Sequence, residues 1–502
     1  MNGRQTRITS AGQAAIAPDT TAQESRHPWL DRRSGMSDRR RRALSSSLRA
    51  VFREAIPGGA SMAYVFGSGL LYLCLSQVVT GMFLALYYVP SADHAHTTVA
   101  YITKEVQSGS FIRSLHAYGS SAIVIVLLLH VSQTFLYGAY KGRRKLVWLA
   151  GCVLFALMLG MSFTGYLLPW DQKAYFATTV GTNLLTYIPV LGGPLKSLLR
   201  GGTEMGTLTL SRFFVLHVFL LPALLLAFIA AHIFLFRRAG PAGAIPRDPE
   251  TPEQSTELFY PRQVLVDFVF ALLIIAGLGV LAHYSPVALG PKASPSDTQY
   301  VPRPEWYYIP VFQWLKYWES GFAIVGVLVI PAFVALLFVG LPFLDRRPER
   351  RPWKRPLSVS IYGFIFIGLG ALGGVSHRND LRNPVIAGRL AKQRADVEAF
   401  MRRPFEPEAA GSSPLAALFL SPAASQGKKV FERERCTECH GADLSGTSSA
   451  PTLVGVGQKY DTGTLRSILR QPTDAMSDGG MQPVDIKEGD LTALIAFLES
   501  VK

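Results

Sequence analysis

Two apolar stretches decide the fold, FIRSLHAYGSSAIVIVLLLHVSQTFLYG (residues 111–138) and SRFFVLHVFLLPALLLAFIAAHIFLF (residues 211–236). Each is longer than the roughly 20 apolar residues that a membrane-spanning helix needs. His116 and His130 lie fourteen positions apart in the first stretch, and His217 and His232 lie fifteen positions apart in the second. Four helical turns return a residue to broadly the same face. Each helix therefore presents two histidines on one face, at depths roughly 21 Å apart.

Neutral imidazole is a good axial ligand for haem iron. Two such helices side by side would provide two His–His pairs, one toward each surface of a membrane. The pattern predicts two non-covalent b haems stacked across the bilayer. For any one of these histidines, the alternative is a core side chain that bonds to a nearby carbonyl. The matched spacing of all four favours the haem ligands.

The composition indicates an integral membrane protein with room for one soluble domain. The 502 residues are 49% hydrophobic and only 17% charged, with positive mean hydropathy. The net charge of +15 does not indicate a nucleic-acid partner, because it is concentrated beside the apolar segments. Residues 1–56 hold eleven arginines against five acidic residues, whereas residues 421–502 are slightly acidic.

Seven segments are long and apolar enough to cross a bilayer as helices. We place them at 62–89, 112–138, 146–168, 212–236, 262–284, 320–343 and 357–375. The connections after the second, fourth and sixth segments are basic, like the N-terminal tail, which predicts that they are cytoplasmic. An odd number of spans puts the C-terminus on the periplasmic or extracytoplasmic side of a bacterial inner membrane. The expected fold class is an all-α membrane bundle plus a small α-helical domain.

Residues 436–440, CTECH, match the CxxCH signature of covalent c-type haem attachment. Cys436 and Cys439 can add to the haem vinyl groups, and His440 can ligate the iron. A redox or zinc CxxC followed by chance by a histidine is the alternative. The segment from 425 to 502 resembles class I cytochrome c, a family in which a methionine before the final helix is the sixth ligand. Met481 fits that role best and Met476 second.

Residues 62–376 closely resemble cytochrome b of the bc-type quinol:cytochrome c oxidoreductases. Glycines in the first and third spans repeat the fourteen-position spacing of the histidines, and glycine lets a flat macrocycle approach a backbone closely. These glycines are Gly67, Gly81, Gly151 and Gly165. A role in packing alone is the alternative. The resemblance pairs His116 with His217 on the outer side and makes Arg113 a haem-propionate partner. It pairs His130 with His232 on the cytoplasmic side.

Pro304-Glu305-Trp306-Tyr307 lies in the long connection between the fifth and sixth spans. The related family uses this tetrapeptide at its quinol oxidation site. A quinol must lose two protons with its two electrons, and a carboxylate beside the outer haem can accept one. The resemblance therefore makes Glu305 catalytic, with Tyr307 and residues 165–171 lining the same pocket. A glutamate in a surface loop is the alternative.

On the cytoplasmic side, residues 260–267 align with a quinone-binding segment of the mitochondrial-type family that ends in Lys-Asp. Asp267 is retained, but Val266 replaces the lysine, and Arg238 stands where that group has a histidine. The resemblance implies a quinone site here with altered ligands.

The subtype resembles the chloroplast cytochrome bf group and its Gram-positive relatives. The likeness rests on the fifteen-position histidine spacing, the sequences LLRGG and GYLLPWDQ, and seven rather than eight spans. In that group the b subunit and its three-helix partner are separate chains, whereas here they are joined. Val65 stands where the group has a cysteine for an extra covalent haem, so we expect no such haem.

The chain divides into five parts. They are an Arg-rich cytoplasmic tail with a short amphipathic helix at 45–56 (1–56), a four-helix dihaem domain (57–240), a three-helix domain (241–377), a partly helical linker (378–424) and a cytochrome c domain (425–502).

Together these features predict a respiratory bc-type cytochrome b that oxidises quinol on the outer side with proton translocation. One electron would pass to a separate Rieske iron–sulfur protein and the other through two b haems to a quinone. A Rieske cluster needs two cysteines and two histidines, and outside CxxCH only Cys74 and Cys152 occur, within spans. The c domain would accept the Rieske electron, or relay it to a further cytochrome c subunit or a terminal oxidase. The resemblance implies a homodimer in a multi-subunit complex.

Two other functions stay open. One is a dihaem membrane anchor that transfers electrons between a soluble dehydrogenase and the quinone pool. Such anchors usually have four or five spans and no Pro-Glu-Trp-Tyr element, which argues against this alternative. The other is an electron-transfer scaffold that has lost its quinol site.

Overall fold

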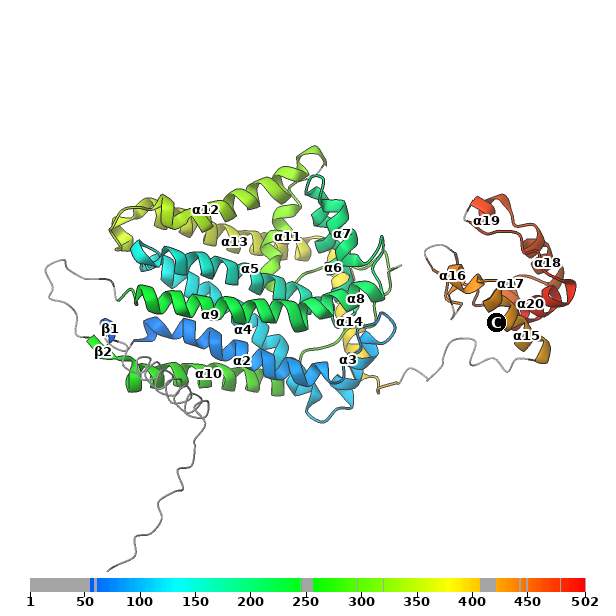
Figure 1. Ribbon diagram of the computed structural model, residues 1–502, viewed down its shortest axis with the longest axis horizontal. Coiled ribbons are helices and arrows are strands. Elements are labelled where there is room, and N and C mark those ends of the chain that lie inside the picture. Colours follow the sequence, from blue (N-terminus) through cyan, green and yellow to red (C-terminus); the bar gives the residue numbers. More distant parts are fainter. Residues whose placement is uncertain are drawn as a thin grey trace, which may run out of the picture.

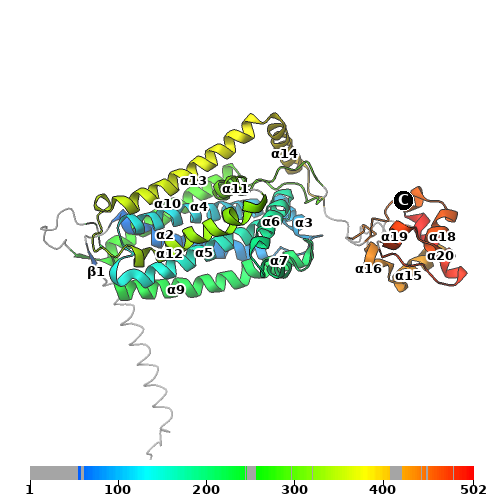
Figure 2. The same ribbon diagram turned by 90° about the horizontal axis from the view of Figure 1, so that it is seen from above.

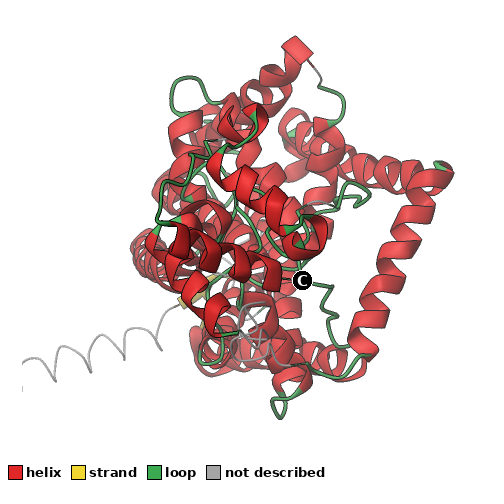
Figure 3. Cartoon of the chain, turned by 90° about the vertical axis from the view of Figure 1, so that its right-hand side faces the viewer, coloured by secondary structure: helices red, strands yellow, loops and turns green. Residues whose placement is uncertain are grey.

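The computed structural model describes residues 55–57, 61–243, 245, 256–295, 297–318, 320–406, 421–441, 444–447, 450–478 and 480–501. Helices dominate the cartoon of these residues, with loops between them and almost no strand (Figure 3). The predicted N-terminal tail lies outside the described residues, except at its end. There, Ala55 and Ile56 were expected in an amphipathic helix. They belong instead to strand β1 (Ala55–Pro57), which pairs antiparallel with β2 (Thr256–Leu258).

Seven helices are long and apolar enough to cross a membrane, which confirms the predicted number. They run side by side along the long axis of the bundle (Figures 1 and 2). The helices that form them are α2 (Val65–Ala85), α4 (Gly109–Leu136), α5 (Lys145–Leu167), α8 with α9 (Thr207–Val215 and Leu221–Ala239), α10 (Val264–Tyr284), α12 (Ile330–Leu344) and α13 (Pro356–Arg382). Short helical turns extend three of the spans at their N-terminal ends, so that the span of α5 begins at Gly142, that of α10 at Phe259 and that of α12 at Val325.

The first four spans form two pairs, because α2 packs mainly on α4 and α5 packs mainly on α9. Halfway along the bundle, Leu73, Ile123 and Val126 are buried in an apolar cluster that also includes Met158 of α5. Helix α10 packs against α2 and α4, and α12 packs against α5. The three-helix part therefore covers the four-helix part from outside.

One end of the bundle gathers the α4–α5, α9–α10 and α12–α13 connections. Lys141 Nζ lies 2.7 Å from Asp345 Oδ1, and the Tyr140 hydroxyl donates to Asp345 Oδ2 at 2.5 Å. Arg355 donates to the Tyr140 oxygen at 2.9 Å, and Arg350 donates to main-chain carbonyls of both other connections. We call Tyr140, Lys141, Asp345 and Arg355 the polar clasp. It joins the three-helix part to the four-helix part.

The opposite end carries the short helices α3 (Ala95–Lys104), α6 (Gln172–Leu184), α7 (Gly192–Arg200) and α14 (Pro384–Arg402), at the right of the bundle in Figure 1. The α10–α12 connection joins them at Gly290, whose carbonyl lies 2.8 Å from His96 Nε2 and whose N–H donates to Asp171 at 3.3 Å. That connection also contains α11 (Ile309–Leu315), which packs against α13.

The segment predicted as a linker from 378 to 424 begins with regular structure. Helix α13 continues to Arg382, and α14 occupies Pro384–Arg402. Lys104 donates to the carbonyls of Phe400 and Arg403, each at 2.7 Å, and lies over the Phe400 ring. The end of α14 is therefore anchored on α3.

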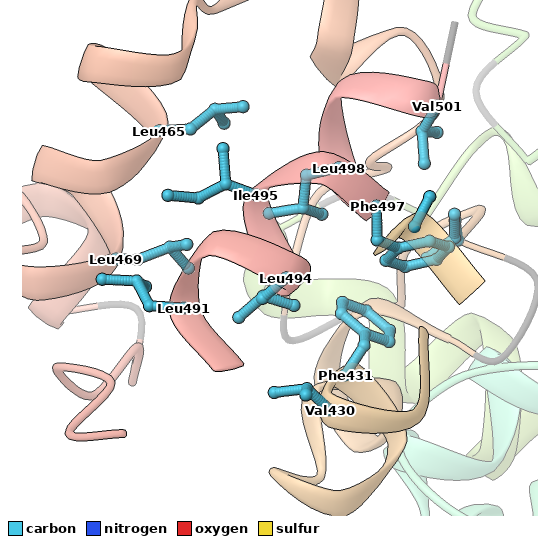
Figure 4. Packing of buried hydrophobic residues seen from close by; sticks show 12 residues of the cluster. Val430, Phe431, Leu465, Leu469, Leu491, Leu494, Ile495, Phe497, Leu498 and Val501 are labelled. Atoms are coloured by element: carbon cyan, nitrogen blue, oxygen red, sulfur yellow. The ribbon is translucent and has the colours of Figure 1, made fainter. Parts of the chain in front are cut away.

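The C-terminal domain contains α15 (Pro422–Arg433), α16 (Cys436–His440), α17 (Val456–Lys459), α18 (Thr462–Arg470), α19 (Asp474–Asp478) and α20 (Glu488–Ser500). Its core lies around α20, with Leu491, Leu494 and Leu498 between α15 and α18 (Figure 4). Helices α15 and α20 cross at Gly427, where a Cβ atom would lie only 1.8 Å from the Ala493 carbonyl oxygen.

Gly427→Ala should therefore destabilise this domain by about 1–3 kcal/mol, the usual cost of overpacking a core. We would measure the urea concentration at which residues 421–501 of the full-length chain become susceptible to protease. Gly489→Ala is the control, because nothing lies within 4 Å of its added Cβ in the first turn of α20. Equal protease resistance of the two variants would contradict the close crossing.

Candidate functional site

The outer histidine layer brings together two rings from different helix pairs. His116 of α4 and His217 have ring centroids 6.3 Å apart at an interplanar angle of 81°. This separation leaves room for one metal ion between two ring nitrogens, since a metal–imidazole bond is about 2 Å long. Gly81 and Gly165 lie against the rings, because added Cβ atoms would meet His116 Cε1 at 3.2 Å and His217 Cε1 at 2.4 Å.

Two threonines determine the tautomer of the outer histidines. Thr80 Oγ1 lies 2.9 Å from His116 Nδ1 and donates to the Ser76 carbonyl at 2.7 Å. Thr164 Oγ1 lies 3.2 Å from His217 Nδ1 and donates to the carbonyl four residues earlier at 2.8 Å. A hydroxyl has only one proton, so each threonine must accept a hydrogen bond from the imidazole. Nδ1 therefore carries the proton, and Nε2 is free to bind a metal.

The inner layer repeats the glycine arrangement without threonines. An added Cβ at Gly67 would lie 3.5 Å from His130 Cε1, and one at Gly151 would lie 3.4 Å from His232 Cε1. Within the described part of the chain, His130 Nδ1 is buried with no hydrogen-bond partner. About four turns of α4 separate the two layers, a rise of roughly 21 Å.

A π-helical turn at Leu216–Leu220 accounts for the unequal histidine spacings. Such a turn inserts one extra residue into an α-helix. The longer interval from His217 to His232 therefore covers the same rotation and rise as the interval from His116 to His130. The extra residue keeps both histidines of this helix opposite their counterparts on α4.

Arg113 lies one turn before His116. It is 9% exposed, and its Nη2 donates to the Val287 carbonyl. Its Nε has no hydrogen-bond partner among the described residues. A buried guanidinium with an unused N–H is suited to an anionic group such as a propionate. The ring spacing, the tautomers and this arginine fit a b haem in the outer layer, and the glycine contacts recur in the inner layer.

Glu305 lies at the same end of the bundle as the outer layer. Its Oε1 accepts a hydrogen bond from Lys173 Nζ at 2.8 Å, and both side chains are partly exposed. Helix α6, which carries Lys173, begins at Asp171, whose Oδ1 accepts from the Ala174 N–H at 2.9 Å. The N-cap and the Gly290 contact of Asp171 therefore fix the start of α6 beside the segment that carries Glu305.

Aromatic side chains surround this carboxylate. The Tyr166 hydroxyl donates to the Arg303 carbonyl at 3.5 Å, and the rings of Tyr307 and Tyr308 are 4.7 Å apart. Burial raises the pKa of the Tyr307 phenol to about 12, so that it remains a neutral hydrogen-bond donor at physiological pH. The site thus combines an anionic acceptor with a protonated phenol.

At the other end of the bundle, Asp267 is buried and accepts a hydrogen bond from Gln263 Nε2 at 2.7 Å. Gln263 is itself fully buried, and its Oε1 accepts from the Ser61 N–H at 2.8 Å. The neighbouring Val266 faces away from Asp267, into an apolar groove of ≈ 290 Å³ between α10 and Met62. Arg238 is exposed at the end of α9.

In the C-terminal domain, His440 Nδ1 lies 3.0 Å from the Pro451 carbonyl oxygen. A carbonyl only accepts, so Nδ1 carries the proton and Nε2 remains free for iron. Cys436 and Cys439 are free thiols on α16. Met481 and Cys436 both pack against the domain core, whereas Met476 is not among the described residues of that cluster. The two free thiols and the unprotonated Nε2 of His440 fit a c-type haem.

The sequence analysis did not identify Thr80, Thr164 and Lys173. A signal for the threonines exists, because each directly precedes a glycine of the outer layer, and no Thr-Gly pair occurs at Gly67 or Gly151. Lys173 carries no such signal. Its contact with Glu305 joins residues 132 positions apart.

Three family models match the chain. The model described as cytochrome b/b6/petB covers residues 51–240, and that described as cytochrome b(C-terminal)/b6/petD covers residues 292–392. The model described as cytochrome c covers residues 424–502. Cytochrome b and cytochrome c domains imply haem b and haem c.

Known proteins similar to the chain include two bacterial subunits. The menaquinol:cytochrome c reductase cytochrome b subunit of Geobacillus thermodenitrificans is 42% identical over 187 residues, which are 37% of this chain and 84% of the relative. The cytochrome bc complex cytochrome b subunit of Chlorobaculum thiosulfatiphilum is 35% identical over 318 residues, 63% of this chain and 73% of the relative.

A solved structure, a hyperthermophilic respiratory Complex III, matches with a TM-score of 0.60 and 26% identity over 74% of this chain and 96% of that chain. The relatives are subunits of multi-subunit oxidoreductases, and the seven apolar helices make this a multi-pass membrane protein. The chain belongs to the cytochrome b family of bc-type complexes, with a cytochrome c domain joined to its C-terminus.

Proposed function

We propose that this subunit oxidises a membrane quinol at its outer end and passes electrons inward through two b haems. The observation that carries the proposal is the position of Glu305 at the same end of the bundle as the His116–His217 layer. A quinol bound there would have a proton acceptor and a haem on the same side of the membrane. Bound haem iron would supply one-electron transfer.

The two b haems and the quinol would be held by the following residues of this chain. His116 and His217 bind the outer b haem through Nε2, with Arg113 beside a propionate. His130 and His232 bind the inner b haem. Glu305 takes a proton from the quinol, and the Tyr307 phenol hydrogen-bonds the quinol oxygen. Haems held at these two layers would supply one-electron transfer across the bilayer, while protons would be released on the outer side.

At the cytoplasmic end, we propose that a quinone receives the electrons from the inner haem near Asp267. A buried carboxyl hydrogen-bonded to Gln263 can pass a proton toward a reduced quinone. The subtype resemblance leaves Val266 where related chains have a lysine, so quinone contacts at this site would differ from theirs.

The remaining quinol electron would go to a separate Rieske iron–sulfur protein and then to the C-terminal domain. Cys436, Cys439, His440 and Met481 would hold one covalent haem c there. From that haem the electron would pass to a further cytochrome c subunit or a terminal oxidase. We propose a homodimer in a bacterial inner membrane, with the polar clasp in the cytoplasm and the C-terminal domain outside.

A dihaem anchor for a soluble dehydrogenase is the second candidate. The seven spans and the Pro-Glu-Trp-Tyr element at residues 304–307 argue against it, because such anchors usually have four or five spans and no such element. The electron-transfer scaffold is tested directly by replacing the Glu305 carboxylate.

Glu305→Gln should lower quinol:cytochrome c turnover by roughly tenfold to a hundredfold, since a neutral amide cannot accept a proton and general bases contribute effects of this order. Turnover would be measured in the purified complex with a reduced quinone and an external cytochrome c. Glu204→Gln removes an exposed acidic residue between α7 and α8 and is the control. Wild-type turnover in Glu305→Gln would refute quinol oxidation at this site.

The haem stoichiometry should be two b haems to one c haem in each chain. A pyridine haemochrome spectrum of the purified chain measures this ratio directly. Replacing both Cys436 and Cys439 by alanine should abolish covalent haem staining while both b haems remain. A ratio of one to one would contradict the two-layer assignment, and residual covalent haem would contradict the inference from Val65.

Thr80→Val should raise the midpoint potential of one b haem by some tens of millivolts and leave the other unchanged. The hydrogen bond that His116 Nδ1 donates makes the imidazole more basic, and a more basic ligand favours the oxidised iron. For a one-electron couple, about 59 mV corresponds to a tenfold change in the equilibrium between oxidised and reduced iron. A redox titration of the b bands measures both potentials. Thr178→Val, which removes a buried hydroxyl bonded only along its own helix, is the control. Equal shifts in both haems would contradict the outer assignment.

A further inference from the structure

Glu305 has a cationic partner that the proposed function does not use. Lys173 Nζ lies 2.8 Å from Glu305 Oε1 and 5.3 Å from the centroid of the Tyr166 ring. Lys173 is on α6, whereas Glu305 is on the connection between α10 and α12. The ion pair therefore joins two separate walls of the outer site.

The pair can break without disrupting the fold. The side chains of Lys173 and Glu305 are 43% and 31% exposed, and ion pairs this accessible to water contribute little to stability. By contrast, Arg303, two residues before Glu305, is held by Asp380 of α13, and those two side chains are only 19% and 16% exposed. The segment is thus fixed at Arg303, while the carboxylate beside it is free to move.

The neighbouring groups do not replace Lys173. Tyr166 of α5 and Tyr307 next to Glu305 are phenols, and Asp171 at the start of α6 is an anion. Arg303 is engaged by Asp380 and stacks over Phe312. Among the described residues, Lys173 is the one cation with an ion pair to Glu305.

We propose that Lys173 is a positioning residue for the proton acceptor of the quinol site, an inference that rests on the proposed function. It holds the ionised Glu305 against α6 and releases it once Glu305 is protonated.

Both the proton and the electron that leave the quinol have an acceptor. The O–H bond of the quinol breaks and an O–H bond forms on Glu305, while the quinol electron goes to the iron–sulfur partner. Neutral Glu305 no longer attracts the ammonium group, so its side chain can turn toward water on the outer side. There it loses the proton, and the returning carboxylate pairs with Lys173 again.

The test compares Lys173→Met, Lys173→Arg, Glu305→Gln and the Lys173→Met/Glu305→Gln double variant in the purified complex. Lys173→Met should lower kcat about fivefold, equivalent to roughly 1 kcal/mol, with little change in KM, because a positioning residue that acts through Glu305 affects proton transfer rather than quinol binding. Lys173→Arg should stay within about twofold of wild type, since a guanidinium also pairs with a carboxylate. The double variant should be no slower than Glu305→Gln alone, because Lys173 acts only through Glu305.

Lys196→Met removes a lysine from α7 and controls for the change in charge at the outer end. The b-haem spectrum of each variant shows whether the bundle is assembled. The inference is overturned if Lys173→Met turns over like wild type while Glu305→Gln is slow. A fivefold further loss in the double variant would also overturn it. If Glu305→Gln itself is as fast as wild type, the proposed function fails instead.

Discussion

The rings of His116, His130, His217 and His232 each lie beside a glycine of the neighbouring helix, and in the outer layer a larger residue would crowd the ring. At Gly165 the constraint is most severe, since an added Cβ would lie 2.4 Å from the His217 ring. This contact brings α5 close to α9, and the equivalent glycines bring α2 close to α4. The four spans consequently pack as two tight pairs, and the imidazoles face each other across the space between the pairs. The position of His217 therefore depends on the absence of a side chain at Gly165, whereas at the inner glycines Gly67 and Gly151 an added Cβ would lie at ordinary contact distances of 3.5 and 3.4 Å.

Much of this arrangement could be predicted from the sequence, because it follows from regular periodicity. Regular histidine spacings and long apolar segments determine helix faces and spans, and the seven spans were confirmed. The glycines lie beside the imidazole rings, and their expected contact with a macrocycle stays a prediction. The π-turn at Leu216–Leu220 could not be derived, since only backbone hydrogen bonding reveals where one extra residue is inserted. The contact between Lys173 and Glu305 could not be predicted from the sequence either, because it depends on how two segments far apart in the chain meet in the fold.

The polar clasp explains how a three-helix part and a four-helix part act as one body. Lys141 and Asp345 are both largely buried, and Arg355 adds a second cation beside the same carboxylate. Removing one partner of a buried pair leaves an uncompensated charge, which is strongly destabilising. The two parts are thus joined by side chains as well as by the chain itself. Such side-chain contacts agree with the resemblance to the chloroplast cytochrome bf group, in which the four-helix part and the three-helix part are separate polypeptides.

The anchoring of α14 on α3 has a consequence for electron delivery. The description of the anchored segment ends at position 406, and the first helix of the C-terminal domain begins at Pro422. The stretch of chain between these two points reaches at most about 55 Å when fully extended. The C-terminal domain therefore stays within that distance of its attachment point on the bundle. Under the proposed function, an electron acceptor carried in this way would remain near its donor, and its supply would not depend on how much soluble carrier the cell makes.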